Sequence, residues 1–352
     1  MTDPQPTASA FSDRRFAVVC AAVFLSFYAL RWWLIVGNRL VADGDECIVG
    51  LMGLHWLKGD PSLYFWGQPY GAGAGVEAAL AALLFKIFTP GAPALKAAGL
   101  IVWTGFALTA AFTSDRIFGR REAWAMLALV AIFPAVGEWA MKIRGGHFLS
   151  LAALTLALWP AARAWERDAG RPLLGSASAV ALLFFSAFMQ PTTIVPAAAL
   201  AAFVFVGALR RRAWGAAVAA VVGGAAIVLL ALYIAAVPGI KPHSSVEGEW
   251  LAAAARVFAF AFLRFFTPWL DPAKVKILPL ENVAALIWLG ASLLATVAAV
   301  ISARRPGRER SALLAALVAG AAAFPGAGLL STENLQPRHL FPLYPVFCLF
   351  LA

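Results

Sequence analysis

Residues 16–36 read FAVVCAAVFLSFYALRWWLIV, an apolar run whose length decides the class of fold. A helix rises about 1.5 Å per residue, so about 20 apolar residues cross the roughly 30 Å hydrocarbon core of a bilayer. The run closes with Arg31, Trp32 and Trp33, a cationic and aromatic group typical of a membrane surface. The alternative, a cleaved signal peptide, has a shorter apolar part. We therefore predict a transmembrane helix here.

Runs of the same kind recur along the chain. Further spans are predicted near residues 95–113, 123–137, 148–162, 174–189, 192–209, 214–237, 283–302, 311–330 and 340–352. The composition agrees, because 62% of the residues are hydrophobic and 13% are charged, whereas soluble domains carry about 25% charged residues. The prediction is one all-α domain over residues 1–352, a polytopic transmembrane helical bundle of about ten spans.

Two details of this bundle stay open in the sequence. The polar break at 189–192, which contains Gln190 and Pro191, is either a tight turn or a kink within one helix. The last run stops at Ala352 and is short for a full span. We therefore expect the natural chain to continue past Ala352.

The net charge of +10 is a topology signal. Arginines crowd the short connections between alternate spans, whereas most acids lie in the longer segments. The arginines are Arg14, Arg15, Arg116, Arg120, Arg121, Arg163, Arg167, Arg171, Arg210, Arg211, Arg212, Arg304, Arg305, Arg308 and Arg310. By the positive-inside rule this predicts a multi-pass protein of the inner or plasma membrane with a cytoplasmic N-terminus. The basic loops then face the lipid bilayer, and no nucleic acid is needed to explain them.

Two long segments, 37–94 and 238–282, are predicted to face the extracytoplasmic side and to carry the function. The first contains Asp43-Gly44-Asp45-Glu46, followed by an amphipathic surface helix over 47–58. Asp45 is expected to be the N-cap and Glu46 to lie in the first turn. Capping needs only one acid, so three acids within residues 43–46 suggest a catalytic role as well. Poor solvation at the membrane edge raises the pKa of a carboxyl and makes it a better general base.

A mixed aromatic and polar stretch follows this helix. Tyr64, Trp66, Gln68 and Tyr70 combine ring faces with hydrogen-bonding groups, which suits a sugar and equally suits an ordinary membrane-interface belt. Glu77 then opens a short apolar helix over 76–88.

At these residues the sequence resembles the GT-C class of glycosyltransferases, in particular the bacterial branch related to protein O-mannosyltransferases and the lipid A aminoarabinose transferase. The resemblance rests on Asp45-Glu46, Gly59-Asp60-Pro61, Gly67-Gln68-Pro69-Tyr70, Glu77 and residues 338–345, RHLFPLYP. His339 stands where that class usually has Tyr. The motifs cover about fifty residues of the chain.

The resemblance implies an enzyme that moves a sugar from a polyprenyl-phosphate donor to an extracytoplasmic lipid, glycan or protein acceptor. It also implies inversion at the sugar, with Asp45 as general base beside Glu46. The leaving phosphate needs cations. Arg338, Lys142 and Arg144 are the candidates, although Lys142 and Arg144 can equally snorkel to headgroups. Substrate contacts are expected from Tyr64, Trp66, Gln68, Tyr70, Glu77 and His339.

No cofactor is assigned from the sequence. Glu247 and Glu249 can bind a divalent metal ion together with Asp45, but the sequence favours their being solvated. The three cysteines, at positions 20, 47 and 348, lack the spacing of a zinc site.

Two alternatives stay open. A transporter or flippase for lipid-linked sugars would favour ionisable residues in mid-span and an internal repeat, and neither stands out in the sequence. A non-catalytic assembly protein of the cell envelope would need no acidic group at the membrane edge. Replacement of Asp45 by Asn distinguishes an enzyme from both.

Overall fold

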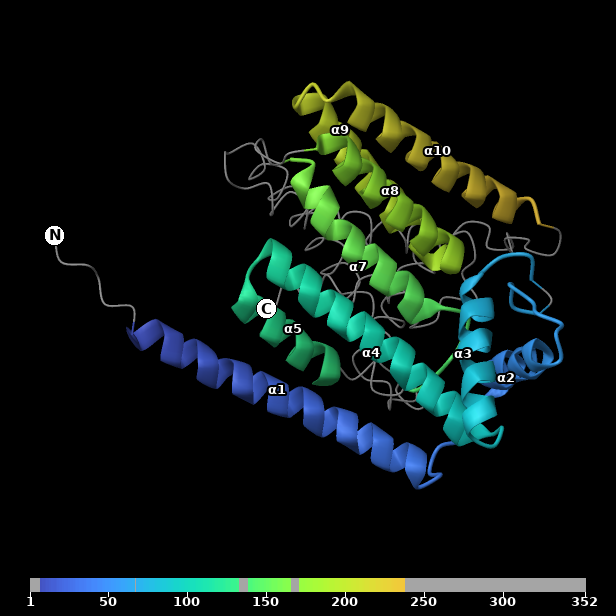
Figure 1. Cartoon of the computed structure of the whole chain (residues 1–352). Coiled ribbons are helices and arrows are strands. Elements are labelled where there is room, and N and C mark those ends of the chain that lie inside the picture. Colours follow the sequence, from blue (N-terminus) through green and yellow to red (C-terminus); the bar gives the residue numbers. More distant parts are fainter. Residues whose placement is uncertain (1–6, 67, 133–138, 166–170, 238–352) are drawn as a thin grey trace, which may run out of the picture.

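A computed structural model describes residues 7–66, 68–132, 139–165 and 171–237. This part of the chain is helical and contains no strand. Its long helices lie side by side in one bundle (Figure 1). They are α1 (Thr7–Val36), α4 (Ala92–Ile117), α5 (Arg120–Ile132), α7 (His147–Arg163), α8 (Pro172–Met189), α9 (Ile194–Arg210) and α10 (Trp214–Ala235).

Five helices are long and apolar enough to cross a membrane: α1, α4, α8, α9 with the turn before it, and α10. The predicted membrane helices are therefore confirmed at these positions by length and composition. Within the described residues α5 covers about 20 Å and α7 about 25 Å, so each is shorter than the roughly 30 Å hydrocarbon core. The three spans predicted after residue 282 lie outside the described residues, as does the whole of the second long segment, 238–282.

The break between α8 and α9 is a turn. Gln190 is extended, with φ −149° and ψ 117°, and a 3₁₀ turn covers Pro191–Thr193. Proline disfavours helical backbone at the residue before it, which ends α8 at Met189. The helix α9 then packs back against α8 instead of continuing its direction.

Aromatic residues of α1, α4 and α7 form the centre of the bundle. Trp103 and Phe106 of α4 are fully buried. The Trp103 ring stacks on Phe24 of α1 with 5.7 Å between centroids, and the Phe106 ring lies 5.6 Å from that of Phe148. Each large ring buries apolar area against the neighbouring helices, and the ring contacts fix those helices relative to one another.

Arg31 corrects one sequence prediction. It does not face a membrane surface but is 4% exposed, inside the bundle. Its Nη2 donates to the Ala131 carbonyl at 2.9 Å, and its guanidinium lies 4.5 Å from the centre of the Trp103 ring. The carbonyl and the ring face together compensate for the loss of water around the cation. Trp33 remains exposed, as the predicted anchor requires.

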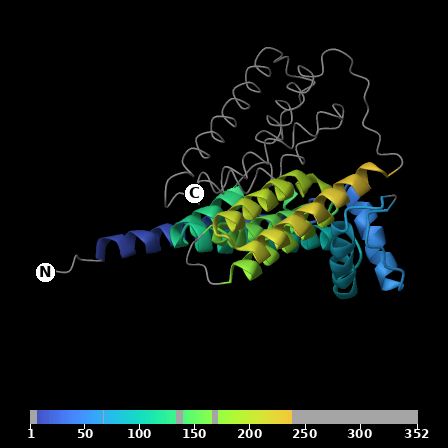
Figure 2. The same ribbon diagram turned by 90° about the horizontal axis from the view of Figure 1, so that it is seen from above.

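The helices α2 (Gly44–Leu57) and α3 (Gly73–Ile87) lie across one end of the bundle (Figure 2). They begin three residues earlier than the sequence predicted. A small second core joins them to the start of α4, with Val49 and Met52 from α2, Ala78 from α3, and Leu95 from α4. This core holds the first long segment against the bundle.

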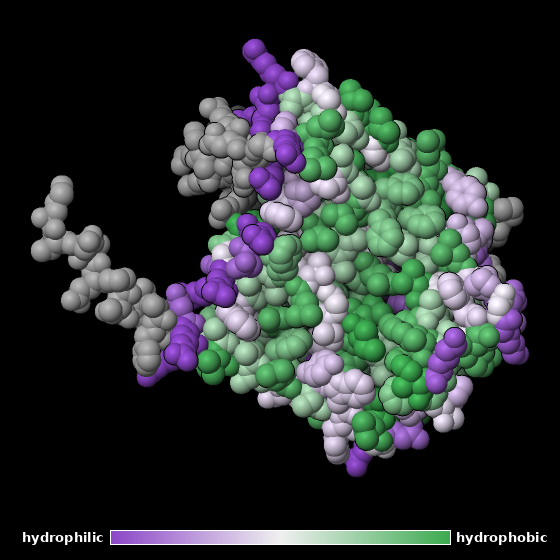
Figure 3. Space-filling view, in the orientation of Figure 1, coloured by the Kyte–Doolittle hydropathy of each residue, from purple (hydrophilic) through white to green (hydrophobic). Residues whose placement is uncertain are grey.

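The arginine-rich connections gather at the opposite end. The Arg121 guanidinium lies 5.2 Å from the Phe16 ring centre, which joins the start of α5 to α1. Arg211 Nη1 donates to the Arg163 carbonyl at 3.2 Å, which joins the ends of α9 and α7. Figure 3 shows a broad apolar surface between hydrophilic residues at the two ends. This arrangement is typical of a membrane protein.

Candidate active site

The start of α2 is fixed by a capping box. Asp43 has extended backbone, with φ −88° and ψ 178°, and its Oδ1 accepts from the Glu46 amide at 3.1 Å. Glu46 Oε2 in turn accepts from the Asp43 amide at 3.1 Å. The prediction that Asp45 is the N-cap is therefore wrong: the N-cap is Asp43, two residues earlier. Asp45 instead lies in the first turn, with its side chain 44% exposed.

Glu46 is directed into the protein. Its side chain is fully buried, and Lys96 Nζ of α4 donates to its Oε2 at 2.5 Å. A buried carboxylate is costly without such a partner, so the pair anchors α2 on α4. Glu46 was predicted to act beside Asp45, but the structure places it behind the acidic turn.

Two cations meet Asp43 from the segment before α7. Arg144 Nε donates to Asp43 Oδ1 at 3.1 Å while its Nη2 donates to Oδ2, and Lys142 Nζ lies 3.3 Å from Oδ2. Burial alone would raise the pKa of Asp43. The hydrogen bonds from Arg144 and the Glu46 amide, and the charges of Arg144 and Lys142, outweigh burial and leave that pKa below its ordinary value. The raised pKa expected for this acidic group is therefore wrong at Asp43.

Arg144 also approaches the predicted base. Its Nε lies 3.8 Å from Asp45 Oδ2, and its guanidinium lies 4.9 Å from the centre of the Trp139 ring. One guanidinium thus joins the two acids of the turn. A guanidinium carries five N–H donors, so the two used on Asp43 leave others for a ligand.

Glu77 is buried behind the segment that carries Arg144. Its Oε2 accepts from the Gly145 amide at 2.9 Å. Burial raises the pKa of Glu77 to about 8; the amides of Gly145, Gly146 and Arg144 oppose this, and the negative charge of Glu46 adds to it. The raised pKa was predicted for the acids of residues 43–46, and that prediction did not include Glu77. Glu77 was predicted to contact substrate, but it holds the backbone of the segment next to the cavity.

Glycines allow the backbone before α7 to approach α3 closely. Gly145 and Gly146 have φ of 86° and 87°, a left-handed conformation that glycine adopts without strain. A Cβ on Gly73 would lie 2.4 Å from the Gly146 Cα. The backbone of α3 and the backbone before α7 are therefore in direct contact.

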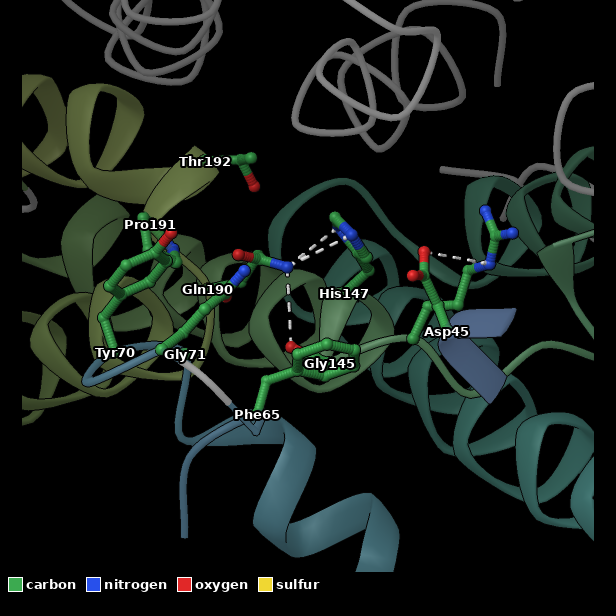
Figure 4. A pocket seen from close by; sticks show the side chains of 11 residues that line it. Asp45, Phe65, Tyr70, Gly71, Gly145, His147, Gln190, Pro191 and Thr192 are labelled. Atoms are coloured by element: carbon green, nitrogen blue, oxygen red, sulfur yellow. Dashed lines mark hydrogen bonds and ion pairs between the residues drawn. The ribbon is translucent and has the colours of Figure 1, made fainter. Parts of the chain in front are cut away.

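A cavity of about 300 Å³ opens between these elements and the α8–α9 turn. Figure 4 shows Asp45 on one side, Tyr70 on the other, and His147 and Gln190 between them. The lining residues are Asp45, Phe65, Gln68, Tyr70, Gly71, Arg144, Gly145, His147, Gln190, Pro191 and Thr192. The structure thus brings together Asp45, Arg144, Gln68 and Tyr70, four residues that the sequence predicted from three separate segments.

His147, Gln190 and Thr192 were missed by the sequence analysis. Gln190 Nε2 lies 3.1 Å from His147 Nε2 and 3.5 Å from the Gly145 carbonyl, so the α8–α9 turn is connected to the start of α7. The signals were present as single polar residues at chain breaks: His147 follows two glycines, and Gln190 precedes a proline.

The other predicted residues lie elsewhere. Tyr64 packs edge-on against Phe188, with centroids 6.2 Å apart, and Trp66 packs against His55 at 4.9 Å. Neither lines the cavity in the described part of the chain. Lys142 is not among its lining residues either; its Nζ lies 3.3 Å from Asp43 Oδ2 and 5.9 Å from the centre of the Trp139 ring. Burial raises the pKa of Tyr70, so its hydroxyl stays protonated as a donor. Arg338 and His339 lie outside the described residues.

No group of three or more His, Cys, Asp or Glu side chains is placed to hold a metal ion within the described residues. The predicted metal-binding partners of Asp45, Glu247 and Glu249, lie outside them.

Comparisons with family profiles, with curated proteins and with solved structures found no match for this chain. The function is therefore argued from the chemistry of the cavity and from the sequence motifs.

Proposed function

We propose that this chain is a membrane glycosyltransferase of the GT-C type, which moves a sugar from a polyprenyl-phosphate donor to an extracytoplasmic acceptor. One observation carries the proposal. Asp45 and Arg144 line the same cavity of about 300 Å³, with 3.8 Å between Asp45 Oδ2 and Arg144 Nε. In one displacement reaction, a carboxylate so placed can take the proton of the attacking hydroxyl, and the guanidinium can stabilise the leaving phosphate.

In the proposed reaction Asp45 removes the proton from the acceptor hydroxyl. The acceptor oxygen then forms a bond to the anomeric carbon, and the bond from that carbon to the phosphate oxygen breaks. The electron pair leaves with the phosphate, so the sugar changes configuration at that carbon. The remaining N–H groups of Arg144 stabilise the leaving phosphate, because guanidinium and phosphate match in charge and geometry.

The position of Arg144 is set by its neighbours. Its two hydrogen bonds to Asp43 and the Trp139 ring beside it restrict the guanidinium. A charged group held in advance loses less conformational entropy on binding than a free surface side chain. Arg338 is proposed as a second phosphate ligand on the strength of the sequence motif.

The remaining lining residues suit a sugar. Gln68, Tyr70, Gln190 and Thr192 supply donors and acceptors for hydroxyl groups, and Phe65 supplies an apolar ring. Pockets for small ligands begin at about 300 Å³, which accommodates a monosaccharide with its phosphate.

The place of the cavity fits a lipid-linked donor. Its lining residues come from the start of α2, the segment between α2 and α3, the start of α7 and the α8–α9 turn. Figure 1 shows these elements at one end of the bundle. A prenyl chain can remain in the hydrocarbon while its phosphate reaches Arg144 at headgroup depth. A lipid donor is needed on the proposed outer side because nucleotide sugars are not available there.

The test is transfer by purified protein supplied with a panel of labelled polyprenyl-phosphate sugars and native membrane acceptors. Asp45→Asn should lower the transfer rate by about 10²–10⁴-fold, the usual effect of removing a general base. Asp60→Asn is the matched control: Asp60 is an acid of the same segment, 80% exposed and paired with His55 away from the cavity.

Near-normal transfer by the Asp45→Asn protein would exclude Asp45 as the base. Absence of transfer from every donor, with a protein that remains folded, would favour a transporter or an assembly protein instead.

A further inference from the structure

A second cavity, of about 230 Å³, lies at the other end of the bundle, between the end of α7 and the start of α8. Arg163, Arg171 and Trp159 are among the residues that line it, together with Leu174 and Ser178. The proposed transferase reaction uses none of these residues.

Positive charge surrounds this cavity. Arg163, at the end of α7, and Arg171, the residue before α8, are exposed and line the cavity. The Arg116 guanidinium lies 5.7 Å from the centre of the Trp159 ring, and Arg211 donates to the Arg163 carbonyl. Four arginines therefore lie at or next to this cavity: one from the last turn of α4, two from the α7–α8 region and one that follows α9. The described residues that line the cavity include no acid.

We infer that this cavity binds a phosphate group, and that in the membrane the phosphate belongs to the headgroup of an anionic phospholipid. Arginine presents paired N–H donors that match phosphate oxygens. Clustered guanidinium groups also repel one another, and an anion between them removes that repulsion.

The surroundings favour a lipid over free phosphate. Leu173 and Leu174, in the first turn of α8, are 54% and 62% exposed beside Arg171. Trp159 belongs to the residue type that concentrates at membrane interfaces. A headgroup in the cavity would place its acyl chains along these apolar side chains, whereas inorganic phosphate would leave them uncovered.

The proposal does not rest on the proposed transferase activity. The first cavity is lined at the start of α7 and the end of α8, and the second at the end of α7 and the start of α8, so failure of one proposal leaves the other untouched.

The experiment measures the thermal unfolding of the full chain, purified in a neutral detergent, while lipid is added. Phosphatidylglycerol should raise the midpoint, because a ligand that binds only the folded state stabilises it. Phosphatidylcholine and inorganic phosphate at the same concentration should give a much smaller rise. A rise with inorganic phosphate as large as with phosphatidylglycerol would show a free-anion site and overturn the lipid assignment.

The variant Arg163→Gln/Arg171→Gln should bind phosphatidylglycerol on the order of tenfold more weakly or worse, since it loses both charge-assisted contacts. The matched control is Arg120→Gln/Arg212→Gln, which removes two exposed arginines from connections at the same end without touching the cavity. An equal response of the two double variants would overturn the site.

Two further variants keep the test decisive if the double variant folds poorly. Arg163→Lys and Arg171→Lys retain charge but lose the paired donors, so each should weaken the lipid response partially. Should these variants lower stability equally with and without lipid, the arginines serve only the fold, and the inference is wrong.

Discussion

Arg144 is the residue on which the candidate active site depends most. It donates to Asp43, the N-cap of α2, and lies 3.8 Å from Asp45. Its backbone amide also helps to hold Glu77. A change at Arg144 therefore alters the charge at the cavity and the contact between α2 and the segment before α7.

Arg144→Lys separates charge from geometry. Lysine keeps the positive charge but loses the paired donors, so donor binding should weaken by about tenfold or more, the effect of losing a charge-assisted hydrogen bond. The measurement is the affinity for a labelled polyprenyl-phosphate sugar, with Arg39→Lys as the control because Arg39 contacts Trp33 away from the cavity. Unchanged donor affinity with a lower midpoint of unfolding would make Arg144 a purely structural link.

Glu77 predicts a particular dependence of stability on pH. Its pKa of about 8 in the folded protein lies above the ordinary 4.5, so the folded state binds the proton more tightly than the unfolded state. This contribution to stability is fully present below about pH 4.5 and is lost as pH rises through about 8. The unfolding midpoint should therefore fall between pH 5 and about 8.

Glu77→Gln tests this assignment. The amide resembles the protonated acid and can still accept from the Gly145 amide, so most of the fall in midpoint over that pH range should disappear. Asp60→Asn, an exposed acid on the same side, should leave the fall unchanged. An identical pH profile for Glu77→Gln and the unaltered protein would contradict the assignment to Glu77.

Sequence patterns found some site residues and missed others for physical reasons. Asp45 and Arg144 stood out because charged residues at a membrane edge need an explanation. His147 and Gln190 gave no such signal, because a single polar residue beside glycine or proline is common in any turn. The burial of Glu77 depends on contact between segments about seventy residues apart, which no local pattern reports.

At the scale of elements, α4 is the support for the segment that carries Lys142 and Arg144. A Cβ on Gly99 would lie 2.6 Å from the Met141 carbonyl carbon and 2.7 Å from the Lys142 amide nitrogen, so helix and segment are in backbone contact. Gly105, in the same helix, faces open space. The two glycines have the same helix propensity, but only Gly99 is in contact with another segment.

Gly99→Ala should therefore destabilise the protein and lower transfer activity, because the segment must move away from α4 and take Arg144 with it. Gly105→Ala should be neutral or stabilising by up to about 1 kcal/mol, the difference in helix propensity between the two residues. The measurements are the midpoint of unfolding and the transfer rate of both variants. Equal behaviour would show that the contact at Gly99 is unimportant.

The helices themselves were predictable to the extent that their apolar runs are long and bounded by clear breaks. The helix α8 ends at Met189 as expected, because Pro191 follows Gln190. The start of α2 was placed too late, because Asp43 and Asp45 are both good N-caps and only the reciprocal contact with Glu46 distinguishes them.

On the scale of the whole molecule, charge and function are divided between the two ends of the bundle. The arginine-rich connections and the proposed lipid site occupy one end, and the acidic turn with the larger cavity occupies the other. The sequence predicts that the arginine-rich end is cytoplasmic. A lipid-linked donor for the larger cavity depends on that orientation.

Single cysteines at the two ends test the orientation. Lys58 and Arg120 are exposed. Lys58 follows α2 and Arg120 begins α5, and Figure 1 shows α2 and the start of α5 at opposite ends of the bundle. In a background without Cys20, Cys47 and Cys348, Lys58→Cys should react with a membrane-impermeant maleimide in intact cells. Arg120→Cys should react only after the membrane is opened.

The reverse labelling pattern would place the larger cavity in the cytoplasm, where nucleotide-activated sugars are available. The argument for a polyprenyl-phosphate donor would then fail, although Asp45 and Arg144 would still share one cavity. Labelling of both cysteines in intact cells would indicate leaky membranes. A cytoplasmic marker protein with its own cysteine, expressed in the same cells, shows whether the maleimide has entered. Labelling of Lys58→Cys alone places Asp45 and Arg144 on the side where a lipid must deliver the sugar.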